Sequence, residues 1–267
     1  MKSISLALLF VTLLICSSVE ANSLGRIVNG DQAVFYQFPW HCSIQNTKTT
    51  AAKAYCGGTL IAANYVLTAA SCLKDVSLIQ VDYGSILFSQ PFETQYTTQY
   101  QNHPQYNEQY KINNIAIIRL PASVTFRTNV RAILLPRVSD QGDTYESYDS
   151  YVSGFGVAEA GSSYLSNELR YAQKTVISND VCRQSFDYRY IESTVLCATG
   201  FNGSTQSICY GDQGGALISH IDGAWVQIAV ASNIHPNGCT GLAPAAYTRV
   251  GPYLEWIERL TGIALRP

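Results

Sequence analysis

The chain has 267 residues and a nearly balanced charge, with 17 basic and 19 acidic side chains. Only 13% of its residues are charged, and it contains no run of Lys or Arg. This composition argues against electrostatic binding of nucleic acid or of an anionic membrane surface. The length is enough for one large domain or two small ones, each with a hydrophobic core.

The N-terminus has the pattern of a secretory signal peptide. Lys2 supplies a positive charge, Leu6 to Ile15 form an apolar run, and Val19–Ala21 fits a cleavage site of small residues. The apolar run is too short to span a bilayer. We therefore predict that residues 1–21 are removed and that the mature protein is secreted, without a membrane anchor.

Short runs rich in β-branched and aromatic residues follow, separated by Gly, Asn, Ser and Pro. This pattern is typical of β-sandwiches and β-barrels. One helix is expected at about 252–262, where four apolar residues at helical spacing lie between Pro252 and Gly262. Strands are predicted at 34–44, 58–68, 78–83, 115–120, 151–157, 173–177, 195–198, 225–232 and 246–250.

Two segments, Gln95–Tyr110 and Thr144–Tyr151, are unusually rich in tyrosine. A tyrosine ring offers a large, rigid contact area with a polar tip, a composition typical of binding surfaces. Rings that only cover barrel edges and loops would give the same composition. Both interpretations stay open.

Three short segments carry the strongest functional signal: Leu67–Cys72 (LTAASC), Asn113–Ala116 (NNIA) and Cys209–Gly215 (CYGDQGG). They are joined by Ile27–Gly30 (IVNG) and Cys56–Leu60 (CGGTL). In this order and spacing, the five segments resemble the chymotrypsin/trypsin family of serine proteases. The sequence as a whole is similar to arthropod chymotrypsin-like members of that family. The individual motifs are weak evidence, but the ordered combination is strong.

The resemblance covers 27–265 and implies an all-β fold, with two packed six-stranded antiparallel β-barrels and a C-terminal helix. The N-terminal barrel would take up about 27–135 and the C-terminal barrel about 136–250, with the crossover near Pro136–Gly142. The resemblance also implies three disulfides, namely Cys56–Cys72, Cys182–Cys197 and Cys209–Cys239.

Cys42 is left over from this pairing. The signal peptide takes Cys16 with it, so seven of the eight cysteines remain, and in an oxidising compartment an even set would be expected. Two interpretations remain. Cys42 is either a buried free thiol in the strand after Trp40 or forms an intermolecular disulfide with a partner.

At each catalytic motif the residue that would do the chemistry is replaced. The resemblance puts the family's histidine at Ser71, its aspartate at Asn114 and its nucleophilic serine at Gln213. A serine becomes a nucleophile only when a base takes its proton and a carboxylate orients that base. None of the three replacements can fill these roles, so we predict no catalytic residues. The oxyanion-hole donors, the backbone N–H groups of Gly211 and Gln213, would remain.

The resemblance also implies an activation site. Cleavage between Arg26 and Ile27 would remove a propeptide at 22–26 and free an Ile27 ammonium. That ammonium would pair with Asp212, whose burial without a partner would be costly.

The substrate pocket differs from that of active relatives. The resemblance puts Ser207 at its floor and Ser232 in its wall, where Ile234 and Ala245 replace glycines. The branched Ile234 should narrow the pocket mouth. Asn202 begins a glycosylation sequon on a predicted loop.

These observations predict a secreted, proteolytically inactive serine protease homologue that acts by binding proteins, as decoy, cofactor or regulator. Proteases, their inhibitors or their substrates would be its partners, and no metal or cofactor is expected. The alternative is a residual serine-type endopeptidase of chymotrypsin-like specificity.

Overall fold

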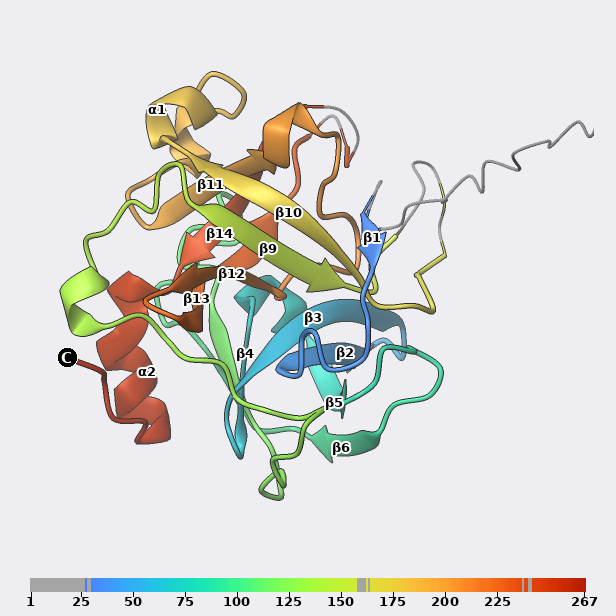
Figure 1. Ribbon diagram of the computed structural model, residues 1–267. Helices are drawn as coiled ribbons and strands as arrows, with labels where there is room; N and C mark the ends of the chain where they lie inside the picture. Colours follow the sequence, from blue (N-terminus) through green and yellow to red (C-terminus); the bar gives the residue numbers. More distant parts are fainter. Residues whose placement is uncertain (1–26, 28–29, 158–161, 163, 237, 240–241) are drawn as a thin grey trace, which may run out of the picture.

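The computed structural model describes residues 27, 30–157, 162, 164–236, 238–239 and 242–267. Two antiparallel β-sheets form its framework, with β9–β14 in the upper half of Figure 1 and β2–β6 in the lower half. The predicted all-β architecture is confirmed. Short helical turns connect the strands, at η1 (Ala70–Leu73), η2 (Val138–Asp140), α1 (Asn179–Cys182), η3 (Tyr188–Tyr190), η4 (Phe201–Gly203) and η5 (Gly251–Tyr253).

The N-terminal sheet has seven strands in the spatial order β6-β5-β2-β3-β4-β8-β7. Its two edge strands follow each other in the chain with only Thr98 and Gln99 between them. The backbone therefore links the two edges, and the sheet curls into a half-barrel. The bounds are β2 (His41–Lys48), β3 (Lys53–Ala62), β4 (Tyr65–Thr68), β5 (Val76–Tyr83), β6 (Glu93–Thr97), β7 (Tyr100–Asn102) and β8 (Ala116–Arg119).

The C-terminal sheet follows the order β1-β10-β11-β14-β13-β12-β9. Because β9 also pairs with β10, six of these strands close into a barrel, and β1 extends it from β10. The bounds are β1 (Asp31–Gln32), β9 (Asp149–Gly154), β10 (Arg170–Ile177), β11 (Val195–Gly200), β12 (Ala216–Ile221), β13 (Ala224–Asn233) and β14 (Ala245–Arg249).

The beginning of the mature chain differs from the expected domain division. The sequence assigned residues 27–135 to the N-terminal barrel, but β1 pairs with β10, with Asp31 opposite Tyr171. Ile27 is wholly buried in the core of the C-terminal barrel. Burial of this apolar side chain explains why the leading segment lies against the second barrel.

The predicted strand at 34–44 was also placed too early. Residues 34–37 form a turn, closed by a hydrogen bond from Gln37 N–H to the Val34 carbonyl at 3.2 Å. Tyr36 has a left-handed φ of 71°, which no strand residue adopts. The strand therefore begins only at His41, after Pro39.

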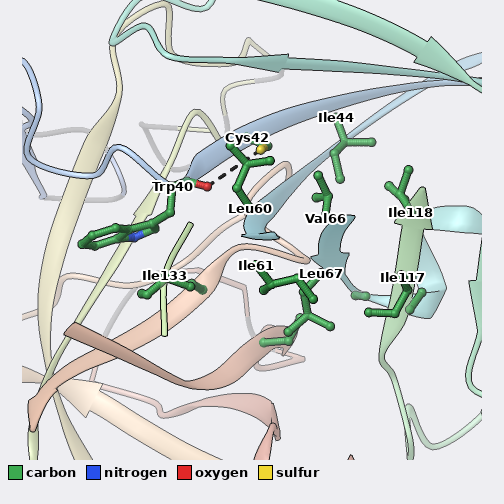
Figure 2. Packing of buried hydrophobic residues seen from close by; sticks show 14 of the residues in the cluster. Trp40, Cys42, Ile44, Leu60, Ile61, Val66, Leu67, Ile117, Ile118 and Ile133 are labelled. Atoms are coloured by element: carbon green, nitrogen blue, oxygen red, sulfur yellow. Dashed lines mark hydrogen bonds between the residues drawn. The ribbon is translucent and has the colours of Figure 1, made fainter. Parts of the chain in front are cut away.

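The larger apolar core fills the N-terminal barrel. Cys42 and Ile44 of β2 point into it together with Leu60 of β3 and Val66 of β4 (Figure 2). Cys42 and Ile44 are two residues apart in β2, so their side chains point to the same face of the sheet. The C-terminal helix α2 (Leu254–Thr261) packs its apolar side against the same core. It ends at Gly262, whose φ of 72° suits glycine, as the sequence predicted.

Cys42 has no exposed surface, and its Sγ lies 3.8 Å from the Trp40 carbonyl oxygen (Figure 2). Burial raises the pKa of this thiol well above its usual range, which keeps it protonated and unreactive. The position favours the buried free thiol over an intermolecular disulfide, because the sulfur cannot reach another molecule without opening the barrel. Among the described residues, no helix is long and apolar enough to cross a membrane.

Candidate active-site cleft

A cleft of about 580 Å³ is lined by residues of two of the three motifs, and the third motif reaches it through hydrogen bonds between Asn114 and Ser71. Ser71 comes from η1 after β4, and Gln213 from the turn before β12. Asn114 lies buried below them, just before β8. The motifs are far apart in the sequence but lie together in the fold. This supports the interpretation that they form one site.

Ser71 and Asn114 form a tight, uncharged pair. The Asn114 Oδ1 accepts a hydrogen bond from the Ser71 backbone N–H at 2.8 Å, and its Nδ2 donates to the Ser71 Oγ at 3.1 Å. The same Nδ2 donates to Ser232 Oγ at 2.9 Å. Both amide protons are thus used, and Asn114 holds Ser71 much as a carboxylate would hold a base. However, neither group can take up a proton near neutral pH.

Gln213 turns its side chain back onto its own loop. Its Oε1 accepts a hydrogen bond from the Gly211 backbone N–H at 3.1 Å. This N–H is one of the two donors that sequence analysis assigned to the oxyanion hole. A ligand carbonyl that needed this donor would have to displace the Gln213 amide first.

Two glycines give this loop its shape. Gly211 has φ of 98° and Gly214 has φ of 86°, a region that strains other residues. A Cβ at Gly214 would collide with Thr68 Oγ1 and with the Gly57 carbonyl oxygen. The Gln213 carbonyl accepts from Gly57 N–H on β3 at 2.7 Å, which ties the loop to the N-terminal barrel. The two glycines and the bond to Gly57 therefore fix the backbone of this loop.

Asp212 is wholly buried under the same loop. It accepts hydrogen bonds from Gly156 N–H at 2.8 Å and Cys209 N–H at 2.9 Å. Burial raises its pKa to about 7, against the opposing effect of these two donors. Ile27 is buried in the same barrel, so its cleaved amine could supply the missing positive charge. Arg26 and residues 1–25 lie outside the described residues, as does the proposed signal cleavage site.

The family model for trypsin matches residues 27–257 of this chain. The chain belongs to the trypsin family. It is 34% identical to trypsin alpha of Drosophila melanogaster, over 87% of this chain and 86% of that protein. It is 29% identical to collagenase of Hypoderma lineatum, over 90% of this chain and 88% of that protein.

Two solved structures resemble the fold closely, which confirms its chymotrypsin-like architecture. The HL collagenase structure matches with a TM-score of 0.81 and 28% identity, over 89% of this chain and 100% of that chain. The scabies mite inactivated protease paralogue S-D1 matches with a TM-score of 0.77 and 25% identity, over 90% of this chain and 99% of that chain.

The three disulfides implied by the trypsin-family resemblance are confirmed. Cys56–Cys72 joins β3 to the Ser71 turn, and Cys209–Cys239 ties down the start of the Gln213 loop. Cys182–Cys197 fastens α1 to β11. Two of these bonds thus fix the two segments that carry Ser71 and Gln213.

The predicted pocket residues occupy two different layers. Ser232 and Ile234 line the trypsin-family cleft, whereas Ser207 and Ala245 are buried and do not line it. Ile234 packs its side chain against the apolar core of the C-terminal barrel and against the Cys209–Cys239 bridge. Its branched side chain thus lies in the wall of the cleft.

Sequence analysis missed two lysines near the site. Lys111 lines the cleft and donates to Tyr106 Oη at 3.3 Å. Lys174 is only 1% exposed and donates to the Gln206 carbonyl, beside Ser207, at 2.6 Å. Burial lowers the pKa of Lys174 to about 7. A lysine at an inward position of β10, between Ala172 and Val176, was the available signal.

The predicted glycosylation site lies on the surface of the molecule. Asn202 is exposed on η4, where an attached glycan would meet no protein. No group of three or more His, Cys, Asp or Glu side chains converges into a metal-binding arrangement within the described part of the chain.

Proposed function

We propose that this trypsin-family chain is proteolytically inactive and acts by binding other proteins through its cleft. The observation that carries the proposal is the Gln213 amide, which stands in place of the nucleophile and accepts from the Gly211 N–H. An amide side chain forms no acyl-enzyme, so the covalent step has no nucleophile. The donor that would stabilise the oxyanion is engaged at the same time.

The neighbouring groups support the proposal. Proton transfer would require a base beside the nucleophile, and the base position holds the Ser71 hydroxyl, bound to the neutral Asn114 amide. Burial raises the pKa of Tyr106 to about 12, so this hydroxyl keeps its proton and cannot act as the base. In a related protease fold, loss of the triad lowers turnover by about 10⁶-fold. Any remaining hydrolysis would therefore be negligible.

The same cleft suits a binding role. Aromatic and aliphatic side chains surround the uncharged centre, among them Phe186, Tyr190, Tyr210 and Ile234. Such a lining binds protein side chains by burying apolar area. Proteases, their inhibitors or their substrates are the partners that a trypsin-family cleft would meet, and the likeness to an inactivated protease paralogue supports this role.

We further propose that the protein is secreted. Three disulfides tie the domain together, which requires an oxidising compartment. The apolar leader at residues 1–21 would provide the export signal, and Asn202 would carry a glycan added on the way.

A residual endopeptidase of chymotrypsin-like specificity is the second candidate. The names of the relatives, collagenase and trypsin alpha, favour it. His235 also lines the cleft, although its Nε2 lies 2.9 Å from the Ser185 carbonyl and its ring packs against Phe186.

A fluorophosphonate probe tests the two candidates. It labels serine nucleophiles that have been activated by a base, so purified cleaved protein should remain unlabelled. Binding should be measured in parallel, by passing native body fluid over the immobilised cleaved protein and identifying what the cleft variant Ile234→Lys fails to retain. The matched control variant is Leu78→Lys, which makes the same kind of change at an exposed apolar residue outside the cleft.

Stoichiometric labelling of the wild type, lost in Ser71→Ala, would establish the endopeptidase. Equal retention of all proteins by the cleft variant and the control would contradict the binding role.

A further inference from the structure

A second surface of the molecule carries exposed aromatic rings and shares no residue with the cleft. Phe35 is 61% exposed and Tyr36 is 59% exposed in the turn before β2. Phe92, just before β6, and Phe126, after β8, are each exposed by about half. Single exposed apolar residues are ordinary, but several on one face mark an interaction site.

These segments lie against one another. Phe35 and Tyr36 line a small hollow together with Gly84 and Asn129. A Cβ built on Gly84 would lie 3.0 Å from the Phe92 Cβ and 3.1 Å from Asn129 Nδ2. The turn before β2, the segment before β6 and the loop after β8 thus meet around Gly84.

The loop after β8 also carries two arginines. Arg127 and Arg131 line a hollow of about 520 Å³ with Phe126. The Arg127 guanidinium lies 5.9 Å from the centroid of the Phe92 ring. Within the described chain, neither guanidinium has a carboxylate partner, unlike Arg137, which pairs with Asp222 at 2.6 Å. Their hydrogen-bond donors therefore face solvent.

The backbone holds this loop in one shape. Arg127 and Val130 exchange two backbone hydrogen bonds, at 2.8 and 3.2 Å. Arg131 N–H donates to the Pro39 carbonyl at 2.9 Å, and Asn129 Nδ2 donates to the Gly84 carbonyl at 2.9 Å. A ligand would therefore meet two guanidinium groups that need little ordering of the backbone, which favours binding.

We propose that this face binds an acidic peptide segment of a partner protein that also carries a large apolar side chain. We name it the aromatic–basic surface and define it by Phe35, Tyr36, Phe92, Phe126, Arg127 and Arg131. Each guanidinium can accept a carboxylate in two parallel hydrogen bonds. The neighbouring rings bury the apolar side chain of the same segment, as aromatic and Arg anchors do in protein interfaces.

An extended polyanion fits this surface less well. The whole chain has a net charge of −2, and the surface contributes only two unpaired arginines instead of a long basic stripe. Polyanion binding draws its affinity from many neutralised charges, whereas a short peptide uses few charges and needs apolar contact as well. The exposed rings supply that contact.

Fluorescence anisotropy with a labelled Glu-Asp-Phe-Glu-Glu-Leu peptide tests the proposal on the full mature protein. The wild type should bind it, with an affinity that falls as salt rises. Arg127→Ala/Arg131→Ala should weaken binding about tenfold or more. Phe126→Ser should weaken it too, and a peptide with Lys at each acidic position should not bind.

The matched control is Lys53→Ala/Arg259→Ala, which removes two exposed positive charges elsewhere and should bind the peptide like the wild type. Thermal unfolding of each variant shows whether it is folded. Absence of wild-type binding, or undiminished binding by the folded double arginine variant, would overturn the proposal. So would binding of heparin but not of the peptide, with the same dependence on Arg127 and Arg131.

Discussion

At the scale of single residues, our proposal of an inactive cleft rests on three side chains, those of Ser71, Asn114 and Gln213. Asn114 makes the contacts that orient a neighbour, but it has no charge to stabilise a protonated base. Gln213 keeps the loop geometry set by Gly211 and Gly214, but it brings an amide to the place of a hydroxyl. The identities of these residues could be predicted to matter from the sequence alone. The return of Gln213 onto Gly211 N–H could not, because it depends on a side-chain torsion.

Restoring the triad alone should not restore efficient proteolysis. Ser71→His/Asn114→Asp/Gln213→Ser supplies the three catalytic groups but leaves Ile234 in the pocket wall. Misplaced substrate costs on the order of 100-fold in rate. We therefore expect the triple variant to hydrolyse a chymotryptic ester weakly, and the further change Ile234→Gly to raise kcat/KM about 100-fold. Efficient turnover by the triple variant alone would show that Ile234 leaves the pocket open.

Burial of Lys174 should lower the free energy of unfolding near neutral pH. Burial lowers its pKa from 10.5 to about 7, so between these values the unfolded chain binds more protons than the folded one. Stability is therefore lost as pH falls from 10.5 to 7. Lys174→Met should raise the free energy of unfolding by about 1–3 kcal/mol at pH 7, with a smaller gain near pH 10. Urea unfolding at both pH values measures this, and a gain that grew with pH would contradict the assignment.

At the scale of strands, the spacing of apolar residues in the sequence predicted many of the strands. The predicted segments 78–83, 173–177, 195–198 and 246–250 lie within or overlap β5, β10, β11 and β14. The sequence missed β6 and β7, because their Gln and Tyr residues show no clear alternation of apolar and polar side chains. It also missed β12, because the buried residues of this strand directly follow the Cys209–Gly215 motif. Assignment of β1 to the second barrel depends on long-range pairing, which no local pattern encodes.

The contact between β2 and β9 should make the molecule sensitive to acid. His41 on β2 is buried, with its Nδ1 lying 3.1 Å from Ser153 Oγ on β9. Burial lowers its pKa from 6.5 to about 4, so the unfolded chain binds more protons as pH falls through this range. Stability should drop by about 1–3 kcal/mol between pH 6.5 and 4 through this group.

His41→Gln keeps a polar side chain but cannot titrate, so its stability should fall less over the same range. Thermal unfolding of both proteins from pH 7 to 4 provides the comparison. Parallel curves for the two proteins would exclude His41 as the source of the acid sensitivity.

At the scale of the whole molecule, the two barrels meet at a cleft whose backbone is that of a trypsin-family protease. The N-terminal segment crosses from one barrel to the other and buries Ile27 in the C-terminal core. Asp212 is buried in the same barrel beneath the Gln213 loop. Proteolytic maturation would therefore affect the stability of the whole C-terminal barrel, even without any catalytic reaction.

Cleavage after Arg26 should remove the loss of stability that the buried Asp212 carboxyl group causes as pH rises. In the uncleaved chain its pKa is raised from 3.8 to about 7, so stability is lost as pH rises between these values. A paired Ile27 ammonium would remove that loss. We expect the cleaved protein to exceed the uncleavable Arg26→Gln variant by about 1–3 kcal/mol at pH 8, and by less at pH 5. Identical stabilities at pH 8 would mean that the new terminus does not insert.

Turnover by the purified, cleaved wild type tests the central claim most directly. Ester and protein substrates of chymotryptic and tryptic type should be incubated with it at high protein concentration, with Gln213→Ala as the reference. We predict rates indistinguishable between the two proteins, because Gln213 performs no chemistry. Hydrolysis by the wild type at an ordinary enzymatic rate would contradict the account.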